Sequence, residues 1–200
     1  RIVMDNSETP YLDQYTIDLS QKVAQNPDKF KAFERENITQ RVLISLVKQI
    51  QNSPLLVGLP GVGKTAIIED LARQILITTD PFLKEKRIIQ ISLANLMNAR
   101  DGESFAYKFQ KIIDELIENK TSVIAFIDEI HQIVGTGAVS SDSALDAGNI
   151  LKPALSRDDL QIIGATTTKE FHDYIARDGA LMRRFDVVEV PELSFHQTAQ

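Results

Sequence analysis

The sequence lacks cysteine altogether, and aromatic residues make up only 6% of its 200 residues. Without cysteine there are no disulfide bonds and no thiolate chemistry, which fits a reducing compartment, and we expect a cytoplasmic protein. No apolar run approaches the roughly 20 residues that cross a bilayer, and the first residues lack the apolar stretch of a signal peptide. We therefore expect no membrane partner.

Basic residues are outnumbered: 22 lysines and arginines face 28 acidic residues, for a net charge of -6. This balance lacks the electrostatic signature of a bulk nucleic-acid binder, so we expect no nucleic-acid partner, although a small basic patch stays open. The sparse aromatic residues favour core packing over a platform for stacking bases. The histidines are too scattered for a zinc site, and we expect no metal ligand among them; they are His131, His172 and His196.

The hydrophobic content of 43% is enough for one sizeable core, so one domain is the default. Residues 1–12 are polar and contain Pro10, which predicts a linker or a frayed end. Residues 13–200 are then the folded domain. The chain stops at Gln200 in a polar stretch, so we expect both ends to be cut from a longer protein.

Within the domain, short apolar runs alternate with segments of helical periodicity. This alternation predicts an α/β fold with a five-stranded parallel sheet and helices on both faces. The expected strands are 54–57, 88–91, 123–127, 160–163 and 185–190. The expected helices are 38–50, 64–77, 105–118, 144–155 and 169–176.

The strongest motif is the segment GLPGVGKT at residues 58–65, which matches the phosphate-binding P-loop between an expected strand and an expected helix. Its glycines let backbone N–H groups converge on phosphate oxygens, and the positive end of the helix adds to the attraction. We expect Lys64 to reach the β and γ phosphates of ATP, and the Thr65 hydroxyl to bind Mg2+. The other expected nucleotide ligands are Gly58, Pro60, Gly61, Val62, Gly63 and Ala66. The plainer alternative is a glycine-rich turn that only joins strand to helix.

Two acids, Asp128 and Glu129, end the apolar run of residues 123–127. They fall at the carboxyl end of a buried parallel strand, where ligands bind in such sheets. We expect Asp128 to act as the Walker-B acid that helps hold Mg2+, and Glu129 to act as the general base that deprotonates the attacking water. The alternative is that the pair only ends a strand or begins a helix.

A later expected strand is followed by two threonines, Thr166 and Thr167. A hydroxyl at the carboxyl end of a neighbouring strand can sense the γ-phosphate, and Thr167 is the better candidate for bonding the phosphate or the water. A threonine next to a helix start is also an ordinary N-cap, so both roles stay open.

These motifs resemble the first nucleotide-binding domain of the Clp family of AAA+ ATPases, the unfoldases and disaggregases of the ClpA, ClpB and ClpC class. The resemblance runs almost end to end and implies the large α/β subdomain of a P-loop ATPase, with a helical lid beyond Gln200. The block at 145–155 resembles this class more than AAA+ proteins in general. The further matching blocks are 15–19, 58–69, 126–131, 134–135, 164–167 and 177–185.

The resemblance also implies partners. It implies a homo-oligomer, a hexameric ring, that acts on protein substrates, with a Clp-type peptidase or an adaptor as further candidates. Arg183 and Arg184 match arginine fingers that would enter the nucleotide site of the neighbouring subunit and stabilise charge on the transferred phosphoryl group. Without the resemblance, two arginines on a solvated turn would be the simpler interpretation.

Three departures from the family pattern stand out. The segment 98–103 has no aromatic residue, whereas the family usually presents one there to grip a threaded polypeptide. Glu34 stands before Arg35 where the family usually has glycine, and segment 156–159 also lacks a usual glycine. The first departure motivates an alternative, a nucleotide-binding regulatory module that assembles without threading. A DNA-directed AAA+ remodeller is a third hypothesis, and the acidic balance counts against it.

Overall fold

The computed structural model describes residues 8–32, 34–134, 142–157 and 159–192. Residues 1–7 of the expected linker and 193–200 of the expected domain lie outside this range. So do Gly135 and Asp158, which belong to the motifs discussed above. Within the described residues, no helix has the length and apolar character that crossing a membrane requires.

A single sheet forms the centre of the molecule, with strands in the order β1-β3-β4-β5-β2-β6. The five strands from β3 to β6 in this order are parallel to one another, which confirms the expected five-stranded parallel sheet. The short β1 adds an antiparallel edge beside β3, and the sequence did not predict it. The strands are β1 (Thr16–Asp18), β2 (Ser53–Gly58), β3 (Arg87–Ile91), β4 (Val123–Ile127), β5 (Ile162–Thr167) and β6 (Phe185–Glu189).

The helices cover both faces of this sheet. Asp18, Ser92 and Ser104 cap the starts of α2, α5 and α6 with side-chain hydrogen bonds to backbone N–H groups. The helices are α1 (Pro10–Tyr15), α2 (Leu19–Ala24), α3 (Glu36–Leu46), α4 (Lys64–Ile77), α5 (Leu93–Asn98), α6 (Phe105–Glu118), α7 (Asp142–Leu155), α8 (Thr168–Glu170) and α9 (Gly179–Met182). Short 3-10 turns lie at Pro27–Phe30 (η1) and Ile130–Gln132 (η2), and a π-helical turn at Phe171–Ile175 (η3) follows α8.

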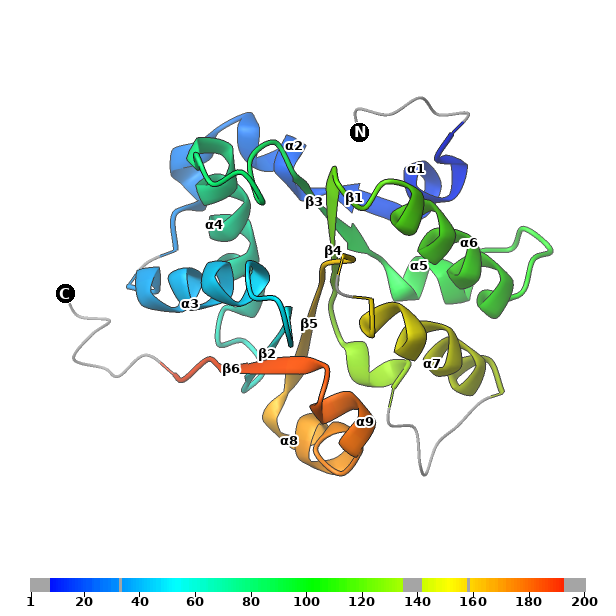
Figure 1. Cartoon of the computed structure of the whole chain (residues 1–200). Helices are drawn as coiled ribbons and strands as arrows, with labels where there is room; N and C mark the ends of the chain where they lie inside the picture. The colour runs from blue at the N-terminus through cyan, green and yellow to red at the C-terminus, as the bar shows by residue number, and fades with distance from the viewer. Residues whose placement is uncertain (1–7, 33, 135–141, 158, 193–200) are drawn as a thin grey trace.

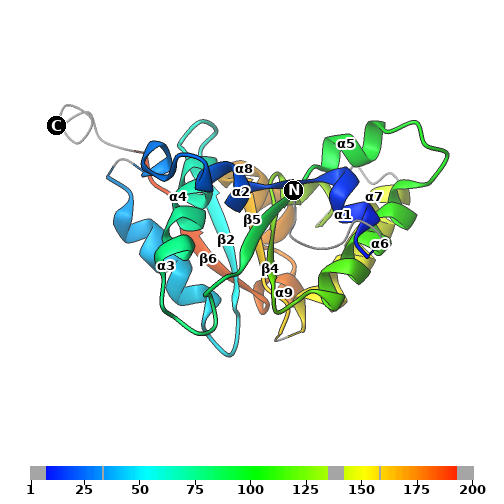
Figure 2. The same ribbon diagram turned by 90° about the horizontal axis from the view of Figure 1, so that it is seen from above.

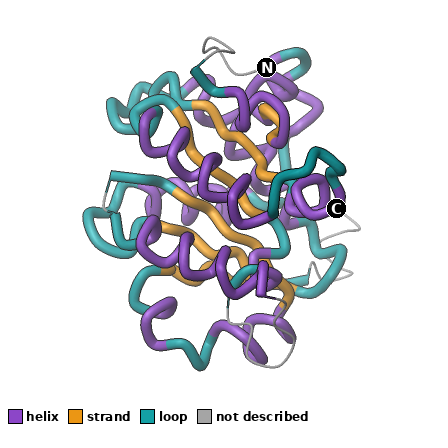
Figure 3. Tube along the Cα trace, turned by 90° about the vertical axis from the view of Figure 1, so that its right-hand side faces the viewer, coloured by secondary structure: helices purple, strands orange, loops and turns teal. Residues whose placement is uncertain are grey.

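Alternate strand residues feed two separate hydrophobic cores. Leu55 and Ile89 point to the core under α1, α5, α6 and α7, whereas Leu56 and Ile88 point to the core under α2, α3 and α4. Figures 1 and 2 show these two helical layers on opposite sides of the sheet. In Figure 3 the strands lie behind the helices of the first layer. Burial on both faces explains why the strands read as continuous apolar runs.

The expected linker at residues 1–12 is wrong for residues 10–12, because helix α1 begins at Pro10. Leu12 is fully buried, and the backbone N–H groups of Tyr11 and Leu12 donate to the carboxylate of Glu115 on α6 at 3.2 and 3.0 Å. Burial raises the pKa of Glu115. The start of the described chain is therefore part of the domain.

The register of the sheet brings three strand ends to one edge. Gly58 of β2 pairs with Thr167 of β5, and Ile127 of β4 pairs with Gly164 of β5. Because β5 lies between β2 and β4, the P-loop, the threonines and the two acids all leave the sheet at its carboxyl edge. This edge is where parallel α/β sheets bind ligands.

Candidate nucleotide-binding and catalytic site

The loop between β2 and α4 has the backbone that a P-loop requires. Gly61 and Gly63 have φ angles of 76° and 100°, in the left-handed region that favours glycine. A Cβ on Gly58 would lie 2.6 Å from the carbonyl oxygen of Val190, so only glycine fits there. Helix α4 begins at Lys64, as the sequence predicts, and its first N–H groups face the loop.

Lys64 is held over this loop. Its Nζ donates to the carbonyl oxygens of Gly58 and Leu59 at 2.8 and 3.1 Å. Burial lowers the pKa of Lys64, and the negative charges of Asp128 and Glu129 oppose that effect.

A cleft of about 790 Å³ continues from the P-loop, a volume in the range of small-molecule sites. Gly58 and Leu59 form one end of it, and residues 187–192 form another wall. Arg35 also lines the cleft; its Nη2 donates to the carbonyl oxygen of Val62 at 3.2 Å, and burial lowers its pKa. This contact ties the chain before α3 to the phosphate loop, and no motif in the sequence marks it.

Glu34 lines the same cleft, and its backbone conformation explains why a glycine is usual at its position. Its φ angle is 52°, in the left-handed region that costs a side-chain-bearing residue about 1–2 kcal/mol. One carboxylate oxygen, Oε2, is buried without a hydrogen-bond partner among the described residues. The departure at Glu34 therefore places strain and a carboxylate beside the predicted nucleotide.

The acid pair leaves β4 as predicted. Oδ1 of Asp128 accepts the backbone N–H of Glu129 at 2.9 Å, and Glu129 has a φ angle of 54°. Strained backbone of this kind often occurs at active sites. The side chain of Glu129 is 50% exposed, so a water molecule can approach it.

Thr65 and Asp128 offer oxygen donors of the kind that Mg2+ prefers. Thr65 is exposed, and no cluster of three or more His, Cys, Asp or Glu side chains lies among the described residues. Mg2+ in nucleotide sites takes one or two protein oxygens and completes its shell with phosphate and water. The donor set therefore fits Mg2+ bound together with a nucleotide.

The two threonines of β5 have different partners. The hydroxyl of Thr167 accepts the N–H of Glu170 at 3.2 Å, so the N-cap that the sequence left open is present. Its hydroxyl hydrogen can still donate to a phosphate or a water. Thr166 is fully buried, and its Oγ1 lies 3.0 Å from Nδ1 of His131. The sequence pattern predicts no role for His131.

Arg183 and Arg184 lie at the opposite edge of the sheet. They precede β6, whose first residue, Phe185, pairs with Ser53 at the start of β2. The P-loop follows the other end of β2, about 20 Å away along the strand. Arg184 donates to Ser156 Oγ at 3.0 Å and to the Ala180 carbonyl at 2.9 Å.

Arg183 is exposed and has no side-chain hydrogen bond or ion pair within the part of the chain that the structure describes. The two arginines therefore differ: one is anchored to its own chain, and the other is available to another molecule.

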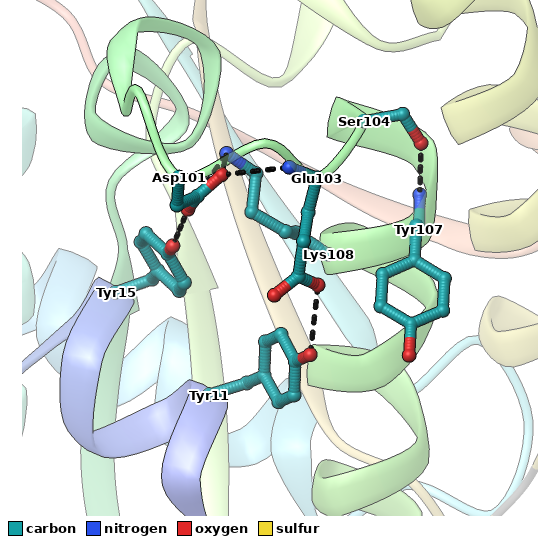
Figure 4. Close-up of polar contacts among 7 residues, drawn as sticks. All are labelled: Tyr11, Tyr15, Asp101, Glu103, Ser104, Tyr107 and Lys108. Carbon is teal, nitrogen blue, oxygen red and sulfur yellow. Dashed lines mark hydrogen bonds and ion pairs between the residues drawn. The ribbon is translucent and has the colours of Figure 1, made fainter.

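The segment between α5 and α6, where the expected aromatic is missing, is fastened to the domain (Figure 4). Asp101 accepts the Tyr15 hydroxyl and pairs with Lys108 Nζ at 3.3 Å; Lys108 is only 1% exposed. The Tyr11 hydroxyl donates to Glu103 at 2.8 Å. The hydrogen bond to Asp101 raises the pKa of Tyr15 to about 12 and lowers that of Asp101. Asp101 is thus turned toward α1 and α6.

Known proteins match both the sequence and this geometry. The model of the AAA family, described as "ATPase family associated with various cellular activities", matches residues 54–192. The chaperone protein ClpB of Mycoplasmoides gallisepticum is 41% identical over 187 residues, 92% of this chain and 26% of the relative. The "negative regulator of genetic competence ClpC/MecB" of Bacillus subtilis is 39% identical over 197 residues, 98% of this chain and 24% of the relative.

Solved structures agree. The Hsp104–ADP complex of S. cerevisiae has a TM-score of 0.79 and 38% identity, covering 94% of this chain and 32% of that one. An Hsp104–casein complex from the same organism has a TM-score of 0.77 and 39% identity, with the same coverage. The chain spans about a quarter of the length of its curated relatives. On the match over residues 54–192 and the identity to ClpB and ClpC, this chain belongs to the AAA family of ATPases and is a domain of the Clp type.

Proposed function

We propose that this domain binds and hydrolyses ATP with Mg2+, as one module of a Clp-type machine that unfolds or remodels protein substrates as a homo-hexameric ring. The observation that carries the proposal is the convergence of the P-loop of β2 and the acid pair of β4 at one edge of the sheet. Relatives whose names describe ClpB chaperones and an Hsp104–casein complex support the protein substrate. They do not favour the regulatory alternative. A cytoplasmic location, a peptidase and an adaptor stay predictions.

Binding follows from the charges and the cleft. The cleft beside Arg35 would take the base and ribose, and the N–H groups at the start of α4 would take the phosphates. Lys64 would exchange its bonds to two loop carbonyls for bonds to phosphate oxygens. Thr65 and Asp128 would hold Mg2+, which neutralises phosphate charge when bound.

Hydrolysis would depend on Glu129, the acid of the pair that does not hold Mg2+. Glu129 would take a proton from a water molecule whose oxygen attacks the γ-phosphorus. The bond between that phosphorus and the β–γ bridging oxygen breaks, which yields ADP and phosphate. The hydroxyl of Thr167 would donate to the γ-phosphate or to the water. Arg183 of a neighbouring subunit would stabilise the charge on the transferred group, and Arg184 would set the turn that presents it.

Two variants of the purified protein test this proposal. Lys64→Ala should abolish detectable ATP binding, because it removes the cation at the phosphates. Glu129→Gln should keep ATP binding and slow hydrolysis by about a hundred-fold or more, because the amide cannot accept the proton. The measurements are ATP affinity with and without Mg2+ and the steady-state rate of phosphate release.

The matched control is Glu118→Gln, the same change at an exposed position at the end of α6. It should behave like the parent. Hydrolysis by Glu129→Gln at the parent rate would remove the general-base assignment. An absence of Mg2+-dependent ATP binding by the parent would overturn the whole proposal.

A further inference from the structure

His131 lies between two residues of the predicted catalytic edge. It belongs to the 3-10 turn η2, Ile130–Gln132, directly after the acid pair. Its Nδ1 is 3.0 Å from Oγ1 of Thr166, and its Nε2 is 3.5 Å from Oε2 of Glu129. One ring thus connects a buried hydroxyl on β5 to the carboxylate predicted to activate water.

The ring of His131 is fixed in place. It stacks on the ring of Tyr174 in the π-helical turn η3, with centroids 6.5 Å apart and planes inclined by 14°. The histidine side chain is 14% exposed, and its hydroxyl partner Thr166 is fully buried. A ring held by packing on one side and a buried hydrogen bond on another has little freedom to rotate.

The side chain of Glu129, in contrast, is free to move. Its side chain is 50% exposed, and the structure pairs it with a single described side chain, that of His131. Without that partner, a half-exposed glutamate would sample several rotamers, and few of them would aim the carboxylate at a water in line with the γ-phosphorus. Misplacing a reacting group by about 1 Å can cost a hundred-fold in rate.

The carboxylate of Glu129 can only accept, so a hydrogen bond between it and the ring requires a proton on Nε2. The Thr166 hydroxyl can donate to Nδ1, which leaves the proton on Nε2, facing Glu129. A separation of 3.5 Å is long for a hydrogen bond, but the half-exposed carboxylate of Glu129 has room to move closer to the ring. Catalytic hydrogen bonds are often long before the substrate is bound.

We infer that His131, oriented by Thr166, is a positioning residue that aims the carboxylate of Glu129 at the attacking water. The inference rests on the proposed ATP hydrolysis. His131 itself exchanges no proton with the substrate; it donates one hydrogen bond from Nε2 to Glu129 and accepts one at Nδ1 from Thr166. His131 is not among the residues that line the cleft, so we expect nucleotide binding not to depend on it.

The test compares hydrolysis with binding in the purified protein. His131→Ala should lower kcat about ten- to a hundred-fold and leave the dissociation constant for ATP within two-fold of the parent. His131→Gln should recover much of the rate, because its amide can donate to Glu129 and accept from Thr166. Thr166→Val keeps the buried shape and removes the donor, so it should lower kcat by a smaller factor.

Combining the changes adds a further check. The double variant with His131→Ala and Thr166→Val should be no slower than His131→Ala alone, because the hydroxyl acts through the ring. Gln132→Ala, at the exposed neighbouring position, is the control and should match the parent. The melting temperature of each variant reports any general loss of structure.

The outcomes separate this inference from the proposed function. If the parent does not hydrolyse ATP, the proposed function fails. If the parent hydrolyses ATP and His131→Ala does so at the same rate, only the positioning role fails. Two other results also overturn the inference: a loss of ATP affinity in His131→Ala by as large a factor as the loss of rate, or a failure of His131→Gln to restore the rate. Either result would show that the substitution disturbs the structure of the site and not the orientation of Glu129.

Discussion

The ion pair between Asp186 of β6 and Arg41 of α3 should contribute strongly to stability. Both carboxylate oxygens accept from Arg41, at 2.7 and 2.8 Å, and Lys48 Nζ lies 3.1 Å from Oδ2. The Asp186 side chain is only 10% exposed, whereas both basic partners are about two-fifths exposed. Removing one partner of a fully buried pair costs about 3–5 kcal/mol, and solvent around the cations reduces this. We expect Asp186→Asn to cost about 2 kcal/mol, or about 4–8 °C in Tm.

The dependence on pH gives this prediction its sign. The hydrogen bonds from Arg41 hold the pKa of Asp186 well below its usual range. A carboxyl with a depressed folded-state pKa stabilises the fold above its unfolded-state pKa of about 4, and that stability is lost as the pH falls toward the folded-state value. The difference in Tm between the parent and Asp186→Asn should therefore be full at pH 7 and shrink by pH 3.

Thermal unfolding followed by circular dichroism at several pH values is the assay. The control is Asp173→Asn, which removes the carboxylate of an exposed helical pair with Lys169 and should leave Tm unchanged. An equal loss of Tm in both variants, or a difference between Asp186→Asn and the parent that is as large at pH 3 as at pH 7, would refute the reasoning.

Two further predictions concern the arginines and the fastened loop. Arg183→Ala should slow ATP hydrolysis at least ten-fold and leave Tm unchanged. Arg184→Ala should also lower Tm, because the Arg184 side chain donates hydrogen bonds to Ser156 and to the backbone carbonyl of Ala180. Equal Tm values for the two variants would contradict this distinction. Asp101→Asn should lower Tm because it leaves the buried ammonium of Lys108 without its carboxylate, and adding Lys108→Met should restore part of the loss. Additive losses in that double variant would show that the pair is not coupled.

Most of the sheet could be predicted from the sequence because its strands are buried on both faces. The bounds of β4 and of the long helices α4 and α6 agree with those expected, and α7 begins two residues before its expected start. The strand β1 could not be predicted, because it has only three residues and its one apolar residue, Ile17, is exposed. Helix α3 ends at Leu46, before the predicted Ile50, although apolar residues continue at helical spacing. Ile50 is 75% exposed, so that apolar pattern did not mark a buried face.

The residues of the candidate site also fall into those that the sequence predicts and those that it does not. The P-loop and the acid pair could be predicted because each is a contiguous motif whose residues act together. His131 and Arg35 could not, because their roles depend on partners distant in the sequence: Thr166 lies on another strand, and the carbonyl of Val62 lies 27 residues from Arg35. Nothing in a local pattern marks such pairs. Glu34 is intermediate, since a missing glycine was visible but only the backbone showed its left-handed conformation.

The topology also decides where the predicted arginine fingers can act. Because β6 is parallel to its neighbour β2, the turn that carries Arg183 lies at the amino edge of the sheet, and the P-loop lies at the carboxyl edge. About 20 Å of strand separates the two, whereas an arginine side chain extends about 7 Å from its Cα. No rotamer of Arg183 can therefore reach a nucleotide on its own P-loop. If this arginine takes part in hydrolysis, the site it completes belongs to another copy of the domain, so the proposed finger and the proposed ring depend on each other.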